Sequence, residues 1–215
     1  DAPLDLTEGR FEELRVRPAG DLRCRLAEAT VSAGRLDQPD EGVAAYDLTH
    51  ATVGDVDIDC DADSFDRYRL YRTGFDDFPF ASYHTLLRDN GWHIHEYVHE
   101  PEQPVTVEGL EQTYLEAKQG AADVGDSETG SMFFVWELRY RRRRYAAHAR
   151  TAEHSTSHRV DAAARWVTNG FLDLIAGYGE RPQRTAFLAL AVILGCAVAF
   201  PATEGLVAGD EVVTY

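Results

Sequence analysis

Large apolar residues recur at every fifth position through residues 1–82. The four runs of this pattern are Leu6, Phe11 and Val16; Leu26, Val31 and Leu36; Leu48, Val53 and Ile58; and Phe65, Leu70, Phe75 and Phe80. The period fits neither a helix, at about 3.6 residues, nor a strand, at about 2. It predicts a chain that turns a corner every five residues, with one large and one small residue pointing inward on each side.

The pattern is clearest in the segment Cys24-Arg-Leu-Ala-Glu-Ala-Thr-Val-Ser-Ala-Gly-Arg-Leu36. Here the chain resembles the pentapeptide-repeat family, whose fold is a right-handed quadrilateral β-helix with stacked coils. The resemblance implies about four coils over residues 1–82, with an insertion where residues 38–43 break the register. A generic small β domain with chance spacing is the alternative.

The middle of the chain changes from this period to a helical one. Residues 83–106 are rich in aromatic residues and histidine and contain Pro101 and Pro104, so we expect a closing strand or linker there. Residues 107–150 show two helical stripes joined by a turn at Gly125-Asp126-Ser127-Glu128. They predict a helical hairpin with a basic end, which is similar to the tetratricopeptide-like hairpin that follows some pentapeptide arrays.

Two more helical patterns complete the expected fold, a mixed one of β-helix followed by helices. Residues 159–176 form an amphipathic pattern bearing Trp166, which favours a helix lying along a membrane interface over one packed on the hairpin. Residues 185–200 carry no charge over nearly the ~20 residues that a membrane span needs. We therefore predict a transmembrane helix over residues 184–203 and the start of an extracellular or pore-region segment at 204–215, the alternative being a buried Ala-rich helix.

Charge is distributed unevenly along the chain. Residues 1–130 carry 29 acidic and 11 basic side chains, residues 131–184 carry 5 and 10, and the remainder carries 3 and none. The net charge of −16 with one lysine is typical of a halophile's hydrated surface. Its sign disfavours a nucleic-acid partner. The basic residues precede the apolar run, which predicts a cell-membrane protein with its N-terminal region in the cytoplasm.

Four consecutive arginines close the expected hairpin. They can form a nucleic-acid patch, a solvated face or a membrane contact, and we favour the membrane because anionic headgroups attract basic residues close to an apolar helix. The lipid bilayer is then a partner. The residues expected at the membrane surface are Arg141, Arg142, Arg143, Arg144, Trp166, Arg181 and Arg184.

Catalytic and metal-binding patterns are weak. His84, His93 and His95 are the only metal candidates that we raise, and they lack a cysteine or a metal-ligand spacing. The alternating aspartates over residues 55–63 do not satisfy a calcium-binding loop and indicate the solvated side of an extended chain. We find no nucleophile–base pair or phosphate loop, so we predict neither an enzyme nor a cofactor.

The order of these segments resembles haloarchaeal pentapeptide-repeat proteins that end in a two-helix, potassium-channel-like pore. The resemblance implies that this chain is the cytosolic regulatory region and first membrane helix of a channel for potassium or another monovalent cation, and a homo-oligomer. The pore residues would follow Tyr215, so we expect a fragment. Two alternatives are a membrane-anchored interaction module with a protein partner on its β-helix, and a soluble acidic protein that mimics DNA.

Overall fold

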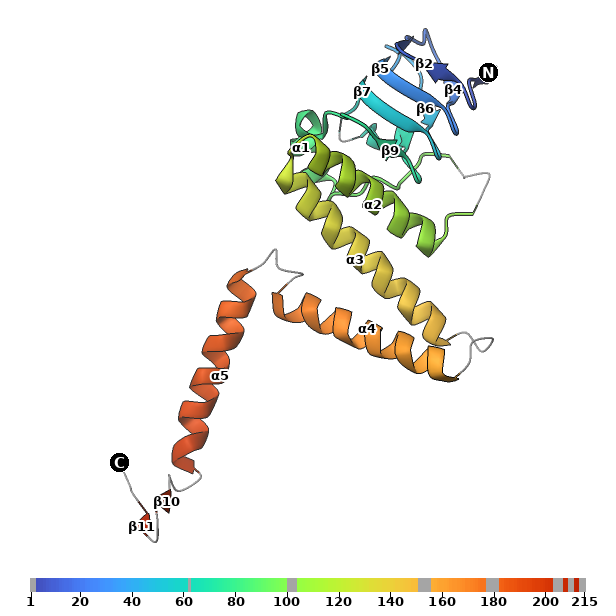
Figure 1. Ribbon diagram of the computed structural model, residues 1–215. Coiled ribbons are helices and arrows are strands. Elements are labelled where there is room, and N and C mark those ends of the chain that lie inside the picture. Colours follow the sequence, from blue (N-terminus) through green and yellow to red (C-terminus); the bar gives the residue numbers. More distant parts are fainter. Residues whose placement is uncertain are drawn as a thin grey trace. The chain divides into compact units, whose positions relative to one another are not determined.

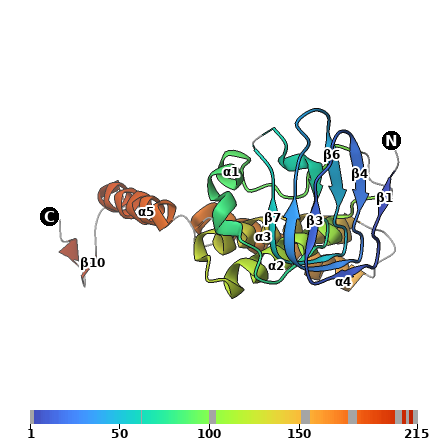
Figure 2. The ribbon, with the colours of Figure 1, turned by 90° about the horizontal axis from the view of Figure 1, so that it is seen from above.

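The N-terminal strands pair with partners one coil further along the chain and build a β-solenoid of about three turns (Figures 1 and 2). Leu4 lies opposite Cys24, 20 residues later, and Cys24 lies opposite Tyr46, 22 residues later. The pairings between successive coils are parallel, as stacking of coils requires. The β-helix predicted from the five-residue period is therefore confirmed as a β-solenoid, but it has about three turns and not the four coils expected.

The computed structural model describes residues 3–61, 63–99, 104–150, 156–176, 182–202, 207–208 and 211–212. One solenoid sheet joins β1 (Leu4–Asp5), β4 (Leu22–Arg25), β6 (Ala44–Asp47) and β8 (Tyr68–Arg69). The other joins β2 (Arg10–Phe11), β3 (Leu14–Val16), β5 (Thr30–Leu36), β7 (Thr52–Ile58) and β9 (Gly74–Phe75). A short 3-10 helix, η1 (Phe65–Arg67), precedes β8.

The solenoid core consists of columns of equivalent side chains from successive coils. Leu26, Leu48 and Leu70 are each at most 2% exposed, and so is Val53 of the neighbouring column. The corner that follows each leucine repeats as well. Residues in the left-handed region occupy this corner in every coil, at Glu8, Glu28, His50 and Arg72. The repeated corner explains the five-residue period, because after each corner the chain again places one large side chain in the interior.

The two later coils are longer than the first. In the earlier of these two, the side chain of Gln38 holds the extra loop at residues 38–43. Its amide nitrogen donates to the carbonyl of Ala44 at 3.0 Å and to the hydroxyl of Tyr68 at 3.0 Å. Its amide oxygen accepts from the Ala44 N–H at 3.2 Å. The break in register over residues 38–43 is thus a loop tied to the next strand.

The segment after the last coil begins as helix. The closing strand or linker expected over residues 83–106 starts instead with the end of η2 (Phe80–Tyr83) and with α1 (His84–Asp89), and its described part contains no strand. Trp92 and Ile94 are buried, and the Val98 N–H donates to the Asp66 carbonyl at 2.9 Å. The segment therefore packs on the solenoid.

The hairpin consists of α2 (Val107–Asp123) and α3 (Ser127–Arg150), which lie side by side (Figure 1). Thr106 caps α2, because its hydroxyl accepts from the Gly109 N–H at 3.0 Å. α2 covers the last strand of the solenoid, with Gly120 against Phe75. It thereby closes the end of the stack, where an open edge would otherwise invite pairing with another chain.

Two further helices follow the hairpin. The chain divides into two compact units, residues 1–163 and 164–215, and α4 (Thr156–Ala176) crosses the boundary. The second unit contains α5 (Pro182–Ala202) and an antiparallel pair, β10 (Val207–Ala208) with β11 (Glu211–Val212).

The predicted transmembrane helix over residues 184–203 is wrong. Although α5 covers residues 184–202 of this range, no helix among the described residues combines the length and the apolar character that crossing a bilayer demands. The uncharged run at 185–200 is about 24 Å long as a helix at ~1.5 Å per residue, against a hydrocarbon core of ~30 Å. Our interpretation weighed the lack of charge above the length.

Candidate functional site on helix α3

The arginine cluster of α3 divides between two faces of the helix. Arg141 and Arg144 point towards α2, where Arg141 Nε lies 2.9 Å and Arg144 Nε lies 3.0 Å from carboxylate oxygens of Glu111. Arg139 and Arg143 lie on another face, one helical turn apart, because residues at i and i+4 are neighbours on a helix. The inward arginines stabilise the hairpin, and the other face is available for binding.

The inward face is an ion-pair network built on Glu137. This side chain is only 2% exposed, yet it pairs with Lys118 of α2 at 2.6 Å and with Arg141 of its own helix. Burial of a carboxylate is tolerated only when opposite charges and hydrogen bonds compensate for lost hydration. The network therefore explains why the one lysine of the chain and two of its arginines lie between the helices.

The second face combines arginines with aromatic rings; we call Trp136, Arg139, Tyr140 and Arg143 the arginine–aromatic face. The guanidinium carbon of Arg139 lies 4.6 Å from the centre of the Trp136 ring, and that of Arg143 lies 4.9 Å from the Tyr140 ring. Such stacking holds a guanidinium by cation–π attraction while leaving its N–H groups available. Within the described residues, neither Arg139 nor Arg143 forms an ion pair with a carboxylate.

The aromatic rings are fixed from behind by His95. One ring nitrogen of His95 hydrogen-bonds the Tyr114 hydroxyl at 2.8 Å, and the other hydrogen-bonds the Tyr140 hydroxyl at 3.1 Å. The two tyrosine rings are stacked, with centroids 5.6 Å apart. Burial lowers the pKa of His95 to about 4, and the neighbouring His93 adds to the shift. A neutral imidazole therefore connects the two helices at neutral pH.

Burial also raises the pKa of both tyrosines that bind His95. The shift is opposed at Tyr140 by the charge of Arg143. The ring of Trp136 is held as well, because its indole N–H donates to the Gly91 carbonyl at 3.1 Å. The arginine–aromatic face thus rests on side chains that are already ordered before any ligand arrives.

The chemistry of this face is that of an anion receptor. Two guanidinium groups one turn apart can each donate a pair of parallel hydrogen bonds to a carboxylate or a phosphate. Because the stacked rings restrict the arginines beforehand, binding loses less side-chain entropy than it would with free arginines. No group on this face is placed to act as a nucleophile or a base.

The histidines raised as metal candidates have other partners. Both ring nitrogens of His95 are engaged by tyrosines, while His84 accepts from Arg88 at 3.0 Å and lies 3.1 Å from Glu128. His93 packs edge-on against Trp136. Among the described residues, no group of three or more His, Cys, Asp or Glu side chains could hold a metal ion.

The remaining residues expected at a membrane surface are placed as follows. Trp166 on α4 is 47% exposed, and Arg142 is half-buried on α3. Arg184 lies in α5, whereas Arg181 lies outside the described residues. The membrane contact of these residues stays a prediction, and Arg141 and Arg144 already have carboxylate partners in the hairpin.

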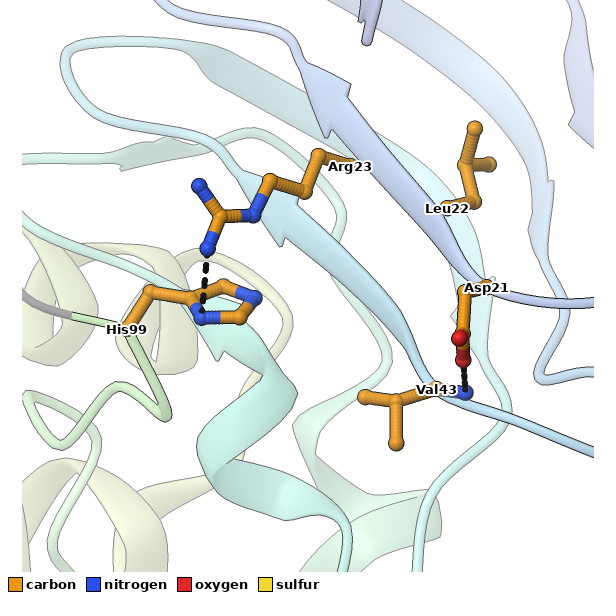
Figure 3. A pocket seen from close by; sticks show the side chains of 5 residues that line it. All are labelled: Asp21, Leu22, Arg23, Val43 and His99. Atoms are coloured by element: carbon orange, nitrogen blue, oxygen red, sulfur yellow. Dashed lines mark hydrogen bonds between the residues drawn. The ribbon is translucent and has the colours of Figure 1, made fainter. Parts of the chain in front are cut away.

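A second candidate is a small pocket of about 240 Å³ on the solenoid (Figure 3). It is lined by Asp21, Leu22, Arg23, Val43 and His99. Its polar groups largely satisfy one another: an Arg23 guanidinium nitrogen lies 3.1 Å from His99 Nδ1, and Asp21 accepts from the Val43 N–H at 2.7 Å (Figure 3). The pocket therefore offers less unused binding chemistry than α3 does.

Comparisons of the chain with protein-family models, with curated proteins and with solved structures find no match. Any function must therefore be inferred from the residues of this chain. On that basis the arginine–aromatic face is the stronger candidate site. Our interpretation of the sequence missed it, although a signal was present: an aromatic residue is followed three positions later by arginine twice, at Trp136–Arg139 and at Tyr140–Arg143.

Proposed function

We propose that this protein is a binding scaffold whose arginine–aromatic face takes an acidic protein segment as its ligand. The β-solenoid is a rigid support, and the hairpin that closes it presents the binding surface. The observation that carries the proposal is the stacking of Arg139 on Trp136 and of Arg143 on Tyr140. Stacking restricts the conformations of both arginines, and among the described residues neither is paired with a carboxylate.

We further infer that the solenoid is a pentapeptide-repeat β-helix. Support comes from the first coil, whose 20-residue repeat from Leu4 to Cys24 equals four sides of five residues. A role as the regulatory region of an ion channel, association with a lipid bilayer and a location at the cell membrane remain predictions. No observation in the described residues favours them over a scaffold that binds protein.

A fluorescein-labelled polyaspartate peptide tests the proposed function. Binding to the full chain, followed by fluorescence anisotropy at low salt, should be saturable, and should weaken as salt screens the charges. The variant Arg139→Gln/Arg143→Gln should lose about tenfold or more in affinity. A labelled polyserine peptide should not bind.

Matched substitutions in the solenoid provide the control. Arg10→Gln/Arg15→Gln removes the same charge from β2 and β3, where Arg10 and Arg15 are both exposed. Compared with the wild type at ~0.1 M salt, it should leave peptide affinity within about twofold, because exposed charges beyond ~10 Å are largely screened at that ionic strength. Equal losses in both double variants would show that net charge alone attracts the peptide, and would contradict a site on α3.

A further inference from the structure

The outer surface of β7 presents a row of carboxylates. Asp55 and Asp57 are exposed and alternate with Val56 and Ile58, which are buried in the solenoid core. The described structure shows no hydrogen bond or ion pair for Asp55, and Asp57 has only a long contact of 3.8 Å with Arg35. Arg35 is held chiefly by Asp37. This row is therefore acidic and free to meet another surface.

The spacing of this row matches that of the arginines on α3. Residues two apart on a strand are separated by about 6.6 Å along its axis, at ~3.3 Å per residue. Residues four apart on a helix are separated by about 6 Å, at ~1.5 Å per residue. Asp55 and Asp57 can thus each face one guanidinium, of Arg139 and Arg143, when the strand and the helix axis run side by side.

We propose that the acidic ligand of the arginine–aromatic face is β7 of a second copy of this chain. This inference rests on the proposed function and names its partner. Arg139 and Arg143 of one copy pair with Asp55 and Asp57 of the next. Because each copy carries a net charge of −16, two copies attract each other only where the basic face of one meets an acidic surface of the other. Each copy carries both surfaces, so the contact is head to tail.

A head-to-tail contact uses different patches on the two partners and can continue from copy to copy. The first expectation follows from this geometry: self-association of the wild type should grow with concentration beyond a dimer. The second follows from the charges, because added salt should dissociate the assemblies. Contacts made by apolar surfaces would instead strengthen with salts that are excluded from the protein surface.

Charge reversal provides the test. The full chain is kept in a mild non-ionic detergent, since α5 exposes apolar side chains, and its size is followed by sedimentation velocity. Arg139→Glu/Arg143→Glu and Asp55→Arg/Asp57→Arg should each raise the dissociation constant of self-association about tenfold or more. Mixed together, the two variants should associate again, because their two unchanged surfaces have opposite charges and so do their two reversed surfaces.

A milder variant keeps the test valid if a charge-reversal variant folds poorly. Asp55→Asn/Asp57→Asn should weaken self-association by a similar factor, and circular dichroism should confirm that it folds. Arg23→Glu/Arg88→Glu changes exposed arginines on β4 and α1, outside both proposed surfaces, and as the control it should associate like the wild type. Failure of the mixed variants to pair, with both folded, would overturn the second copy as partner.

The outcomes separate this inference from the proposed function. If polyaspartate binds through Arg139 and Arg143 but the chain stays monomeric, the scaffold stands and its partner is a different acidic protein. If neither the peptide nor a second copy binds, both proposals fail. Binding only to vesicles that contain phosphatidylglycerol, and not to phosphatidylcholine vesicles, would replace both with the membrane contact predicted from the sequence.

Discussion

Gly120 of α2 lies directly against Phe75 of the last solenoid coil. A Cβ added to Gly120 would overlap the Cβ of Phe75 and lie 3.0 Å from its carbonyl oxygen. The absence of a side chain therefore sets how closely α2 approaches the solenoid. A glycine inside a helix costs about 1 kcal/mol relative to alanine, so close packing of the closing helix offsets a local penalty.

Gly120→Ala should destabilise the protein despite alanine's better helix propensity. The added methyl group must move α2 away from the backbone of Phe75, which we expect to lower the free energy of unfolding by about 1–3 kcal/mol. Urea unfolding followed by circular dichroism measures it. Gly130→Ala is the control: its Cβ would meet atoms only at 3.8 Å or beyond, so it should raise stability by ~1 kcal/mol or less. A stabilising Gly120→Ala would contradict the close contact.

Leu48→Ala should have a large effect because Leu48 lies in the middle of a stacked column. Leu26 precedes it and Leu70 follows it by one coil, and all three are buried. Removing its side chain leaves a cavity that two neighbouring coils cannot both fill, so we expect a loss of about 2–5 kcal/mol. Leu4→Ala, at a position 38% exposed, should cost less than ~1 kcal/mol. Similar losses for the two variants would argue against the column.

The solenoid was predictable from the sequence because its signal is local and repeated. Each coil contributes residues such as Val31 and Val53 to the same column, so one short period is observed several times. The coil length was less predictable: the loop at residues 38–43 depends on hydrogen bonds from Gln38 to the next coil, and spacing alone does not contain such contacts.

The helical half shows where the sequence was insufficient. An uncharged run predicts a helix, and α5 forms, but freedom from charge does not supply the length that a membrane span requires. The arginine cluster was ambiguous for another reason. Whether Arg141 is inward or outward depends on Glu111 and Glu137, and the sequence does not reveal how α2 is rotated against α3.

Glu137→Gln should destabilise the hairpin strongly. The substitution removes the charge that compensates Lys118 at 2.6 Å and Arg141, and leaves both cations partly desolvated. Breaking a buried ion pair by removing one partner costs about 3–5 kcal/mol, and we expect a value near the lower end because Lys118 is 28% exposed. Thermal unfolding of the variant reports the loss.

Glu128→Gln is the matched control for the ion-pair network. Glu128 also pairs with a basic residue of another element, His84 at 3.1 Å, but its side chain is 63% exposed. Water compensates for the lost pair, so the change should stay within ~1 kcal/mol. Equal costs at positions 128 and 137 would show that burial of Glu137 does not set its contribution.

His95 should make the stability of the hairpin depend on pH. Its pKa falls from 6.5 to about 4 on folding, so the unfolded chain binds more protons between these values. The contribution of neutral His95 is complete above pH ~6.5 and is lost as the pH falls towards ~4. His95→Phe leaves the hydroxyls of Tyr114 and Tyr140 without this partner and should cost about 1–3 kcal/mol at pH ~7.

The decisive measurement is the gap in stability between wild type and His95→Phe at two pH values. Urea unfolding at pH ~7 and at pH ~4.5 should show a smaller gap at the lower value, because only the wild type has the imidazole to protonate. Carboxylates titrate in both proteins and cancel in the comparison. His50→Asn is the control, because His50 has a left-handed backbone conformation that asparagine tolerates. Its free energy of unfolding should differ between the two pH values by as much as that of the wild type. A gap that does not change with pH would mean that His95 packs between the helices without linking their stability to its proton.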